Sequence, residues 1–309
     1  MATTTSITTT YAGEFAGQYI AAALLEANTI SRGGITVKPN IAHKEVIKKL
    51  GVNDIVKDAT CDFDATSTVT LTERILEPEQ QQVNLQLCKK DFISDWEAVQ
   101  MGFSSYKSVP PTFADFIIGH VAAKVAERTE TSIWQGATST NGQFDGLSTK
   151  LAADADLPSG QEIAQVSGGV TSANVIAELG KVVSAIPAAV YGRPDLKIYI
   201  SQNIAKAYVS AQAALGYRDN YHVGQTEMNF QGIPLFVANG LADDDMVAAE
   251  SSNLFFGTGL LADHNEVKLL DMADLDGSQN FRLIMRFSAG VQYGAIEDIV
   301  TYGIPNSAN

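Results

Sequence analysis

A long run near the carboxyl end in which every second side chain is apolar constrains the fold most. It runs from Phe281 to Tyr293, where every second residue is apolar and Arg282, Arg286 and Gln292 stand among the residues between them. A period of two predicts a single long strand with one dry face and one wetter face. The rest of the fold has to accommodate that strand.

A long amphipathic helix is predicted from Thr112 to Gly136. Thr112 is a candidate N-cap, with Asp115 as its capping-box partner, and Gly136 stops the helix. The apolar stripe is Phe113, Ile117, Val121 and Val125. At about 1.5 Å per residue, the helix is roughly 35 Å long. Its charged residues, Glu127, Arg128 and Glu130, are predicted to lie on the wet side.

Two extensions are predicted before this helix. Residues 1–40 begin with the Thr-rich MATTTSITTT and are expected to form an extended arm outside the core. From Thr66 an alternating run passes through EPEQQQ and returns through Val83, Leu85 and Leu87, which predicts a hairpin with a charged and amide-rich tip. Such a hairpin is marginal alone, so we expect it to project and to lean on another surface.

After the helix, a turn-rich segment at 138–169 is predicted to join the first lobe to a second, α+β lobe. Amphipathic periodicity predicts helices at 175–186 and 203–215. Strands are predicted at 196–201, 233–238, 246–249, 253–258 and 267–272.

The composition excludes several classes of protein. The chain has 309 residues, of which 45% are apolar, and a net charge of −14, which argues against a surface that coats nucleic acid. It lacks an apolar run long enough for a membrane span and a signal peptide, so we expect no membrane association. Cys61 and Cys88 show neither zinc-site nor redox spacing.

No motif predicts catalysis, and we expect no catalytic, cofactor-binding or metal-binding residues. GTGLLA at 257–262 fits a dinucleotide motif, but a turn and a strand follow it where a helix is needed. In DMADLDGSQN, at 271–280, Met272 stands where a calcium loop needs an acid. The run Asp243 to Asp245 is expected to be a solvated loop, and the four histidines lack metal-ligand spacing. The chain is therefore predicted not to be an enzyme.

The order of these elements resembles the major capsid protein of tailed bacteriophages, which has the Hong Kong 97 fold. The resemblance covers almost the whole chain and is carried by the long helix, by NFQGIPLFVANGL (229–241), by NLFFGTGLLAD (253–263) with VKLLDM, and by the closing strand. The positions taken as fold motifs are Gly136, Gly232, Pro234, Asn253 and Gly257.

The resemblance implies an α+β fold with four parts. They are an N-terminal arm at 1–40, an E-loop at 60–92, a peripheral domain at 41–59, 93–169 and 273–309 with its spine helix at 112–136, and an axial domain at 170–272. The E-loop would lie over a neighbouring copy. Its implied contact residues are Glu73, Arg74, Glu77, Glu79 and Gln80.

In that family, hexamers and pentamers close into an icosahedral shell around double-stranded DNA. The resemblance implies a virion protein, assembled in the host cytoplasm, whose partners are its own copies, a portal protein, and cement or decoration proteins. The fold begins within about 40 residues of Met1, so a separate scaffolding protein, or none, is expected in place of an amino-terminal scaffolding segment. DNA would be enclosed without specific binding, and no covalent crosslink is predicted from Lys89, Lys90 and Asn280.

Three alternatives stay open. An encapsulin-type nanocompartment shares the fold and encloses a cargo enzyme; the Thr-rich arm and the hairpin favour the virus. A soluble enzyme would place its site in the second lobe, near Tyr217, Asp219, His222 and Glu227. A phage tail or decoration protein would lack the spine helix and the α+β lobe.

Overall fold

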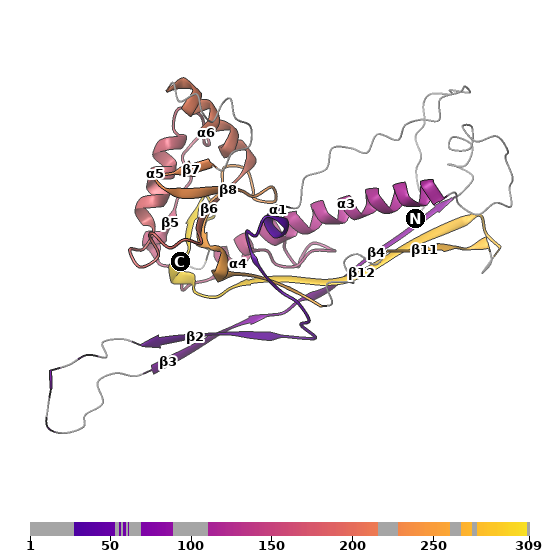
Figure 1. Cartoon of the computed structure of the whole chain (residues 1–309), viewed down its shortest axis with the longest axis horizontal. Helices are drawn as coiled ribbons and strands as arrows, with labels where there is room; N and C mark the ends of the chain where they lie inside the picture. The colour runs from indigo at the N-terminus through magenta and orange to yellow at the C-terminus, as the bar shows by residue number, and fades with distance from the viewer. Residues whose placement is uncertain are drawn as a thin grey trace.

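The computed structural model describes residues 28–52, 56, 58–59, 61, 69–88, 111–215, 228–259, 267–273 and 277–307 (Figure 1). Their strands form a five-stranded sheet, here called the long sheet, a six-stranded sheet, here called the axial sheet, and a two-stranded ribbon. The long sheet and the ribbon extend along the length of the molecule, whereas the axial sheet and its helices form a compact lobe to one side (Figure 1).

The long sheet is built around the predicted strand, β12 (Asn280–Tyr293). On one side, β12 pairs antiparallel with β4 (Glu79–Cys88); on the other, it pairs with β11 (Val267–Asp271) and β10 (Leu254–Thr258). The short β1 (Thr36–Lys38) joins parallel to β10. The alternation is confirmed, because Phe281, Leu283 and Met285 are at most 2% exposed.

The predicted helix is confirmed as α3 (Pro111–Gln135), which runs along the long sheet (Figure 1). It begins at Pro111, whose missing N–H and fixed φ suit a first helical position, so Thr112 lies inside the helix and is not its cap. The helix ends at Gly136 for a packing reason. A Cβ there would lie 2.1 Å from the carbonyl oxygen of Phe144, so only glycine fits.

The axial sheet has the strand order β5-β13-β9-β6-β8-β7. Helices α5 (Val175–Ala185) and α6 (Gln202–Ala214) pack with it around a second apolar core. The strands are β5 (Glu162–Ile163), β6 (Leu196–Ile200), β7 (Met228–Phe230), β8 (Ile233–Val237), β9 (Met246–Glu250) and β13 (Val300–Tyr302). These elements confirm an α+β lobe, but the strands predicted for it at 253–258 and 267–272 are not part of it, because as β10 and β11 they pair with β12 in the long sheet.

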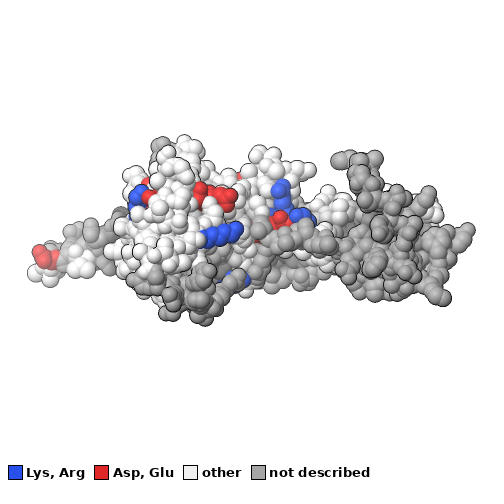
Figure 2. All heavy atoms as spheres, turned by 90° about the horizontal axis from the view of Figure 1, so that it is seen from above, with Lys and Arg blue, Asp and Glu red and all other residues white. Residues whose placement is uncertain are grey.

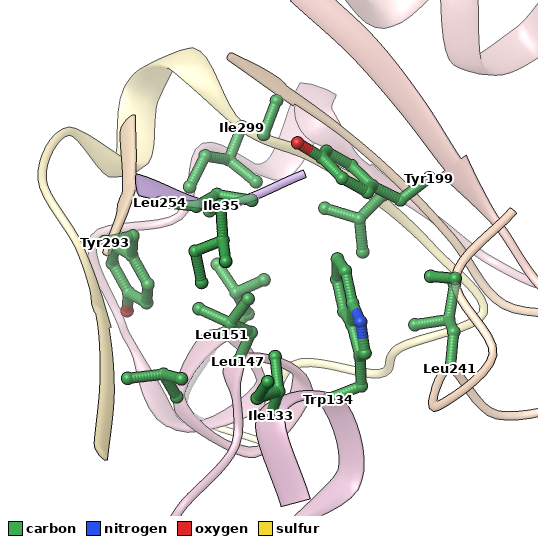
Figure 3. Packing of buried hydrophobic residues seen from close by; sticks show 14 of the residues in the cluster. Ile35, Ile133, Trp134, Leu147, Leu151, Tyr199, Leu241, Leu254, Tyr293 and Ile299 are labelled. Atoms are coloured by element: carbon green, nitrogen blue, oxygen red, sulfur yellow. The ribbon is translucent and has the colours of Figure 1, made fainter. Parts of the chain in front are cut away.

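The first core joins the two sheets (Figure 3). Trp134 at the end of α3 packs against Tyr199 of β6 with ring centroids 5.2 Å apart. Leu147 and Leu151 of α4 (Leu147–Ala153) are fully buried in the same cluster. The segment 138–169 was predicted to be only a connection, but α4 makes part of it core. Short 3-10 turns at Ser159–Gln161, Ser251–Asn253 and Ile296–Asp298 complete the described elements.

The prediction that residues 1–40 lie outside the core is wrong for 28–38, here called the strap. The strap contains α1 (Asn28–Ser31) and β1, and Asn28, Thr29 and Ile35 are at most 5% exposed. It crosses from the axial sheet to the long sheet. Gly34 permits this path, because a Cβ there would lie 2.8 Å from the ring of Phe236.

The strap is held by a carboxylate that was predicted to be solvated. Glu130 of α3 is fully buried. One of its oxygens accepts from the backbone N–H of Thr29 at 3.1 Å, and the other accepts from the Thr29 hydroxyl. That hydroxyl in turn accepts from Nε1 of Trp134 at 2.9 Å. Glu127 was also predicted to lie on the wet side of the helix, and there its carboxylate forms a surface ion pair with Nζ of Lys124 at 2.6 Å.

The predicted hairpin is wrong in its pairing. Strand β3 (Val69–Leu76) pairs with β2 (Glu45–Val52), whereas β4 pairs with β12. The segment around EPEQQQ is therefore no tip: β3 runs on into β4 through Glu77 and Pro78. The projecting hairpin is the ribbon β2–β3, and its tip falls between Val52 and Val69 (Figure 1).

Candidate assembly surface

The ribbon exposes a row of large apolar side chains on one face. Strand register places Val46 opposite Ile75 and Leu50 opposite Leu71, and alternation puts Val69 on the same face. All five are between 42% and 65% exposed. Exposed apolar groups that gather on one face mark an interaction surface. We call these five residues the apolar ribbon face.

The opposite face of the ribbon is fastened to the body of the molecule. Leu76 is fully buried and packs against Gly257, where a Cβ would lie 2.9 Å from the Leu76 side chain. Lys49 pairs with Glu297 at 2.7 Å, and the amide of Gln292 donates to the Ile75 carbonyl at 2.9 Å. The ribbon therefore has a fixed inner face and a free apolar outer face.

Arg74 forms the centre of this attachment. Its guanidinium pairs with Asp154 at 2.5 Å and lies 4.7 Å from the ring centroid of Tyr293, whose hydroxyl donates to Asp154 at 2.6 Å. Burial alone would raise the pKa of Asp154, but the hydrogen bonds from Tyr293, the backbone of Asp156 and Arg74 hold it below its usual value. The pair therefore stays ionised well into the acid range.

The predicted contact residues do not lie at a tip. Arg74 is tied to its own chain, and Glu77 pairs with Lys44 at 2.8 Å. Glu79 lies in β4, where burial, followed by the charge of Asp145, raises its pKa. Glu73 is exposed on the outer face of the ribbon, and Gln80 is exposed on the long sheet. Arg74 and Glu77 lie near the root of the ribbon, where their ion pairs are within the chain, so their predicted place at a tip is wrong.

Sequence reasoning missed the apolar ribbon face. Its β2 residues were not assigned to any strand, so the pairing of Val46 with Ile75 could not be predicted. The available signal was the run EVIKKLGV (45–52), whose alternation matches that of VTLTERIL (69–76).

The fold-motif positions have structural roles. Both side-chain atoms of Asn253 are used: its amide donates to the Ala295 carbonyl at 2.7 Å, and its oxygen accepts from the Ala295 N–H at 2.7 Å. Gly232 has a φ of +84° in the turn between β7 and β8, and Pro234 lies in β8. These positions shape turns and close contacts, and no described contact gives them a chemical role.

The acidic run is not a solvated loop throughout. Asp243 is exposed, but an oxygen of Asp244 accepts from the Asn203 amide at 2.6 Å. Burial and the adjacent Asp244 raise the pKa of Asp245 to about 7. Among the described residues, no group of three His, Cys, Asp or Glu side chains is placed to hold a metal ion.

The remaining candidates are only partly within the described residues. Tyr217, Asp219, His222 and Glu227, and also Lys89 and Lys90, lie outside them. Gly257 of the GTGLLA motif lies in β10, and residues 260–262 are outside. In the described part of the chain, every helix is too short or too polar to cross a membrane.

Comparison with known proteins reveals similarity of structure only. No family model and no curated protein sequence matches the chain. A capsid chain of the native GTA particle superposes with a TM-score of 0.66 at 12% identity, over 93% of each chain. The capsid structure of cyanophage P-SCSP1u gives 0.59 at 13% identity, covering 95% of this chain and 92% of that one. The procapsid of satellite phage P4 gives 0.57 at 12% identity, over 90% and 89%.

Proposed function

We propose that this chain, which has the Hong Kong 97 fold of phage capsid proteins, is the major capsid protein of a tailed bacteriophage. In this role its copies form hexamers and pentamers that close into an icosahedral shell around double-stranded DNA. The role is structural and not catalytic. The shared fold supports this proposal, since it extends over nine-tenths of the chain.

The apolar ribbon face is the observation that carries the proposal. A soluble monomer gains nothing from two strands that extend beyond its body with Leu50, Val69 and Leu71 at least 60% exposed. Burying these side chains against another copy would release their hydration water and supply the main driving force for assembly. A contact of this kind joins different surfaces of successive copies, as the rings of a shell require.

The domains are proposed with several changed boundaries. The E-loop corresponds to the ribbon with its connection, residues 45–76, in place of 60–92. The N-terminal arm is shortened to residues 1–27, because the strap belongs to the core. The axial domain, predicted at 170–272, loses β10 and β11 to the long sheet and gains β5 and β13, so it is proposed to comprise residues 162–250 and 300–302. The peripheral domain, with α3 as its spine, contains the long sheet.

The charge of the chain suits a container that does not adhere to its contents. At a net charge of −14, the chain repels the DNA phosphates overall. On the face shown in Figure 2, the described charged side chains are scattered among uncharged ones. DNA is therefore proposed to be enclosed without specific binding. The further proposed partners are a portal protein, a separate scaffolding protein and decoration proteins, in a virion assembled in the host cytoplasm.

The test is assembly of the purified protein, followed by sedimentation and negative-stain electron microscopy. Wild-type chain is expected to form closed shells or rings, whereas Leu50→Thr with Leu71→Thr is expected to leave soluble, folded subunits. Threonine keeps the β-propensity of these strand positions, so only the apolar area is lost. Thr72→Val, on the opposite face of the ribbon, is the matched control and is expected to assemble.

Each outcome has a clear meaning. If the double variant assembles at the same protein concentration as the wild type, the apolar ribbon face is not part of the contact between copies. A wild-type chain that stays a 33.0 kDa monomer under all assembly conditions would overturn the capsid proposal. Native particles filled with an enzyme and free of DNA would favour the encapsulin alternative.

A further inference from the structure

Residues 304–307, the last that the structure describes, lie across the end of α4. We call them the closing segment. The chain leaves β13 through Gly303, whose φ of +81° favours glycine. Ile304 is 6% exposed and packs in the core that joins the two sheets. Asn306 and Ser307 then reach α4, so one short segment connects the axial sheet to a helix of the first core.

The closing segment supplies hydrogen bonds to the carboxyl end of α4. Carbonyl groups at the end of a helix have no partner within the helix. The backbone N–H of Ser307 donates to the Ala152 carbonyl at 2.8 Å, and its hydroxyl donates to the same oxygen at 3.0 Å. The side-chain amide of Asn306 donates to the Asp154 carbonyl at 2.7 Å. The helix is therefore capped by a segment from a distant part of the sequence.

Asp154 stands between the closing segment and the ribbon. It is the C-cap residue of α4, and its φ of −94° and ψ of 112° are extended, so its backbone no longer follows the helix. Its carbonyl accepts from Asn306, whereas its carboxylate pairs with Arg74 at 2.5 Å. The same carboxylate accepts from the Tyr293 hydroxyl at 2.6 Å. The contacts of its backbone therefore determine where the carboxylate meets the ribbon.

The second ion pair of the ribbon is supported from the same corner of the axial sheet. Glu297 pairs with Lys49 of β2, and its carbonyl accepts from the side-chain amide of Gln161 at 2.6 Å. Gln161 directly precedes Glu162 of β5, whose carboxylate accepts from the backbone N–H of Asn306 at 2.9 Å. Strands β5 and β13 are paired in this sheet. The closing segment and β5 thus support this ion pair as well as the first.

We propose that Asn306 and Ser307 are positioning residues for the ribbon. By capping α4 they hold Asp154 where Arg74 meets it, and so they set the angle at which the ribbon leaves the body. The proposal rests on the proposed capsid function, because a chain that assembles needs its ribbon in one direction. A contact that repeats around a ring closes only when each copy presents it at the same angle.

Hydrogen exchange of dissociated full-length subunits, followed by mass spectrometry, tests the proposal. Asn306→Ala with Ser307→Ala removes both side-chain caps and keeps the backbone N–H groups. The amides of β2 and β3 are expected to exchange about tenfold faster than in the wild type, because each lost hydrogen bond favours opening several-fold. The amides of α6 are expected to exchange at the wild-type rate.

Two further proteins serve as controls. Asn229→Ala with Ser210→Ala, at exposed positions of the axial lobe, removes the same two kinds of side chain and is expected to leave the exchange of the ribbon unchanged. Ser307→Thr keeps the hydroxyl and is expected to behave as the wild type.

The pH dependence of exchange separates positioning from simple support of the helix. Although burial opposes it, hydrogen bonds from Tyr293, the backbone of Asp156 and Arg74 keep the pKa of Asp154 below its usual value. The fastening is therefore lost only as the pH falls through this lowered pKa. In the double variant these bonds weaken, so the pKa of Asp154 is expected to rise toward its usual value and the ribbon to lose protection at a higher pH. The ratio of β3 to β6 exchange at each pH measures this, because the intrinsic pH dependence of exchange cancels.

Exchange results can overturn the proposal while leaving the capsid function intact. Faster exchange in α4 with unchanged exchange in β2 and β3 would limit the effect of the cap to its helix. A uniform rise over the whole chain, or an unshifted pH profile, would show that the segment only stabilises the fold. If the double variant does not fold, Asn306→Ala alone is judged by the same criteria.

Assembly gives the last measurement. The double variant is expected to form open or irregular shells under conditions in which the wild type closes. Closed shells in wild-type yield from a variant with a loosened ribbon would overturn the proposal, because assembly would then not need a fixed angle. Failure of the wild type to assemble would overturn the capsid function instead, which the exchange of subunits does not test.

Discussion

The buried contact between Glu130 and the strap supports a quantitative prediction. Thr29→Val keeps the volume and branching of the side chain but removes its hydroxyl. That hydroxyl donates to Glu130 and accepts from Trp134, so one substitution breaks two buried hydrogen bonds. The backbone N–H of Thr29 still donates to Glu130 at 3.1 Å, which leaves the carboxylate partly supported.

The magnitude follows from these two bonds. A hydrogen bond to a charged group contributes about 1.5–3 kcal/mol, and a neutral one about 1 kcal/mol. Their loss is therefore expected to lower the free energy of unfolding by about 2–4 kcal/mol. A loss of this size is a large share of the stability of an ordinary domain.

The assay is urea unfolding of dissociated subunits, followed by tryptophan fluorescence, with Trp96→Phe as the common background so that the signal comes from Trp134. Thr72→Val, at an exposed strand position, is the matched control and is expected to change stability by less than about 0.5 kcal/mol. A Thr29→Val variant within about 1 kcal/mol of the wild type would refute the reasoning, since the buried carboxylate would then not depend on the hydroxyl.

Three further predictions concern other parts of the molecule. Asp245→Asn is expected to raise the free energy of unfolding at pH 8 by about 1–2 kcal/mol, since solvent reaches this side chain and screens its charge. Little change is expected at pH 4, because the pKa of Asp245 is raised to about 7 and the stability from its neutral form is lost as the pH rises through that value. Thermal melts across this range test it, and equal melting temperatures of variant and wild type at pH 8 would contradict it. Gly136→Ala is expected to lower the free energy of unfolding by about 2–3 kcal/mol, because the added Cβ would overlap backbone atoms. Gly119→Ala, in the open middle of α3, is expected to raise it by about 0.5–1 kcal/mol. Equal urea midpoints for the two variants would contradict this. Asp154→Asn removes the charge partner of Arg74 and is expected to speed amide hydrogen exchange in β2 and β3, with unchanged exchange showing that the ribbon is held without this pair.

The fold was predictable where periodicity is strong. The alternation from Phe281 to Tyr293 and the repeat of apolar residues in α3 each define an element without reference to other parts of the chain. The order of elements was enough to predict the Hong Kong 97 fold, and the structural similarity to phage capsid chains confirms that prediction.

The pairing of β3 was not predictable in the same way. Alternation defines a strand and its faces but not its partner, and Glu77 and Pro78 resemble a hairpin turn although the chain passes straight through them. The contact residues were misplaced for the same reason. With the hairpin drawn around Pro78, Arg74 was assigned to a tip, whereas the structure pairs it with Asp154.

Buried polar contacts were missed because they depend on distant segments. Glu130 comes about five turns into a helix whose other charged residues, Lys124, Glu127 and Arg128, are exposed or half-buried, and only the strap, about 100 residues earlier, makes it a buried group. The strap itself reads as a loop because of Gly33 and Gly34. Its place in the core depends on Tyr199 and Phe236, which sequence spacing does not connect to it.

The continuity of β3 with β4 has a mechanical consequence. The ribbon is not hinged to the body by a loop; its second strand continues directly into a ten-residue strand that is paired along its whole length with β12. The hydrogen bonds of an antiparallel ladder lie perpendicular to the strands, so a pull along β3 loads them together in shear and does not open them one after another. In a shell under outward pressure from its contents, tension on the ribbon would thus be spread over the central strand of each subunit.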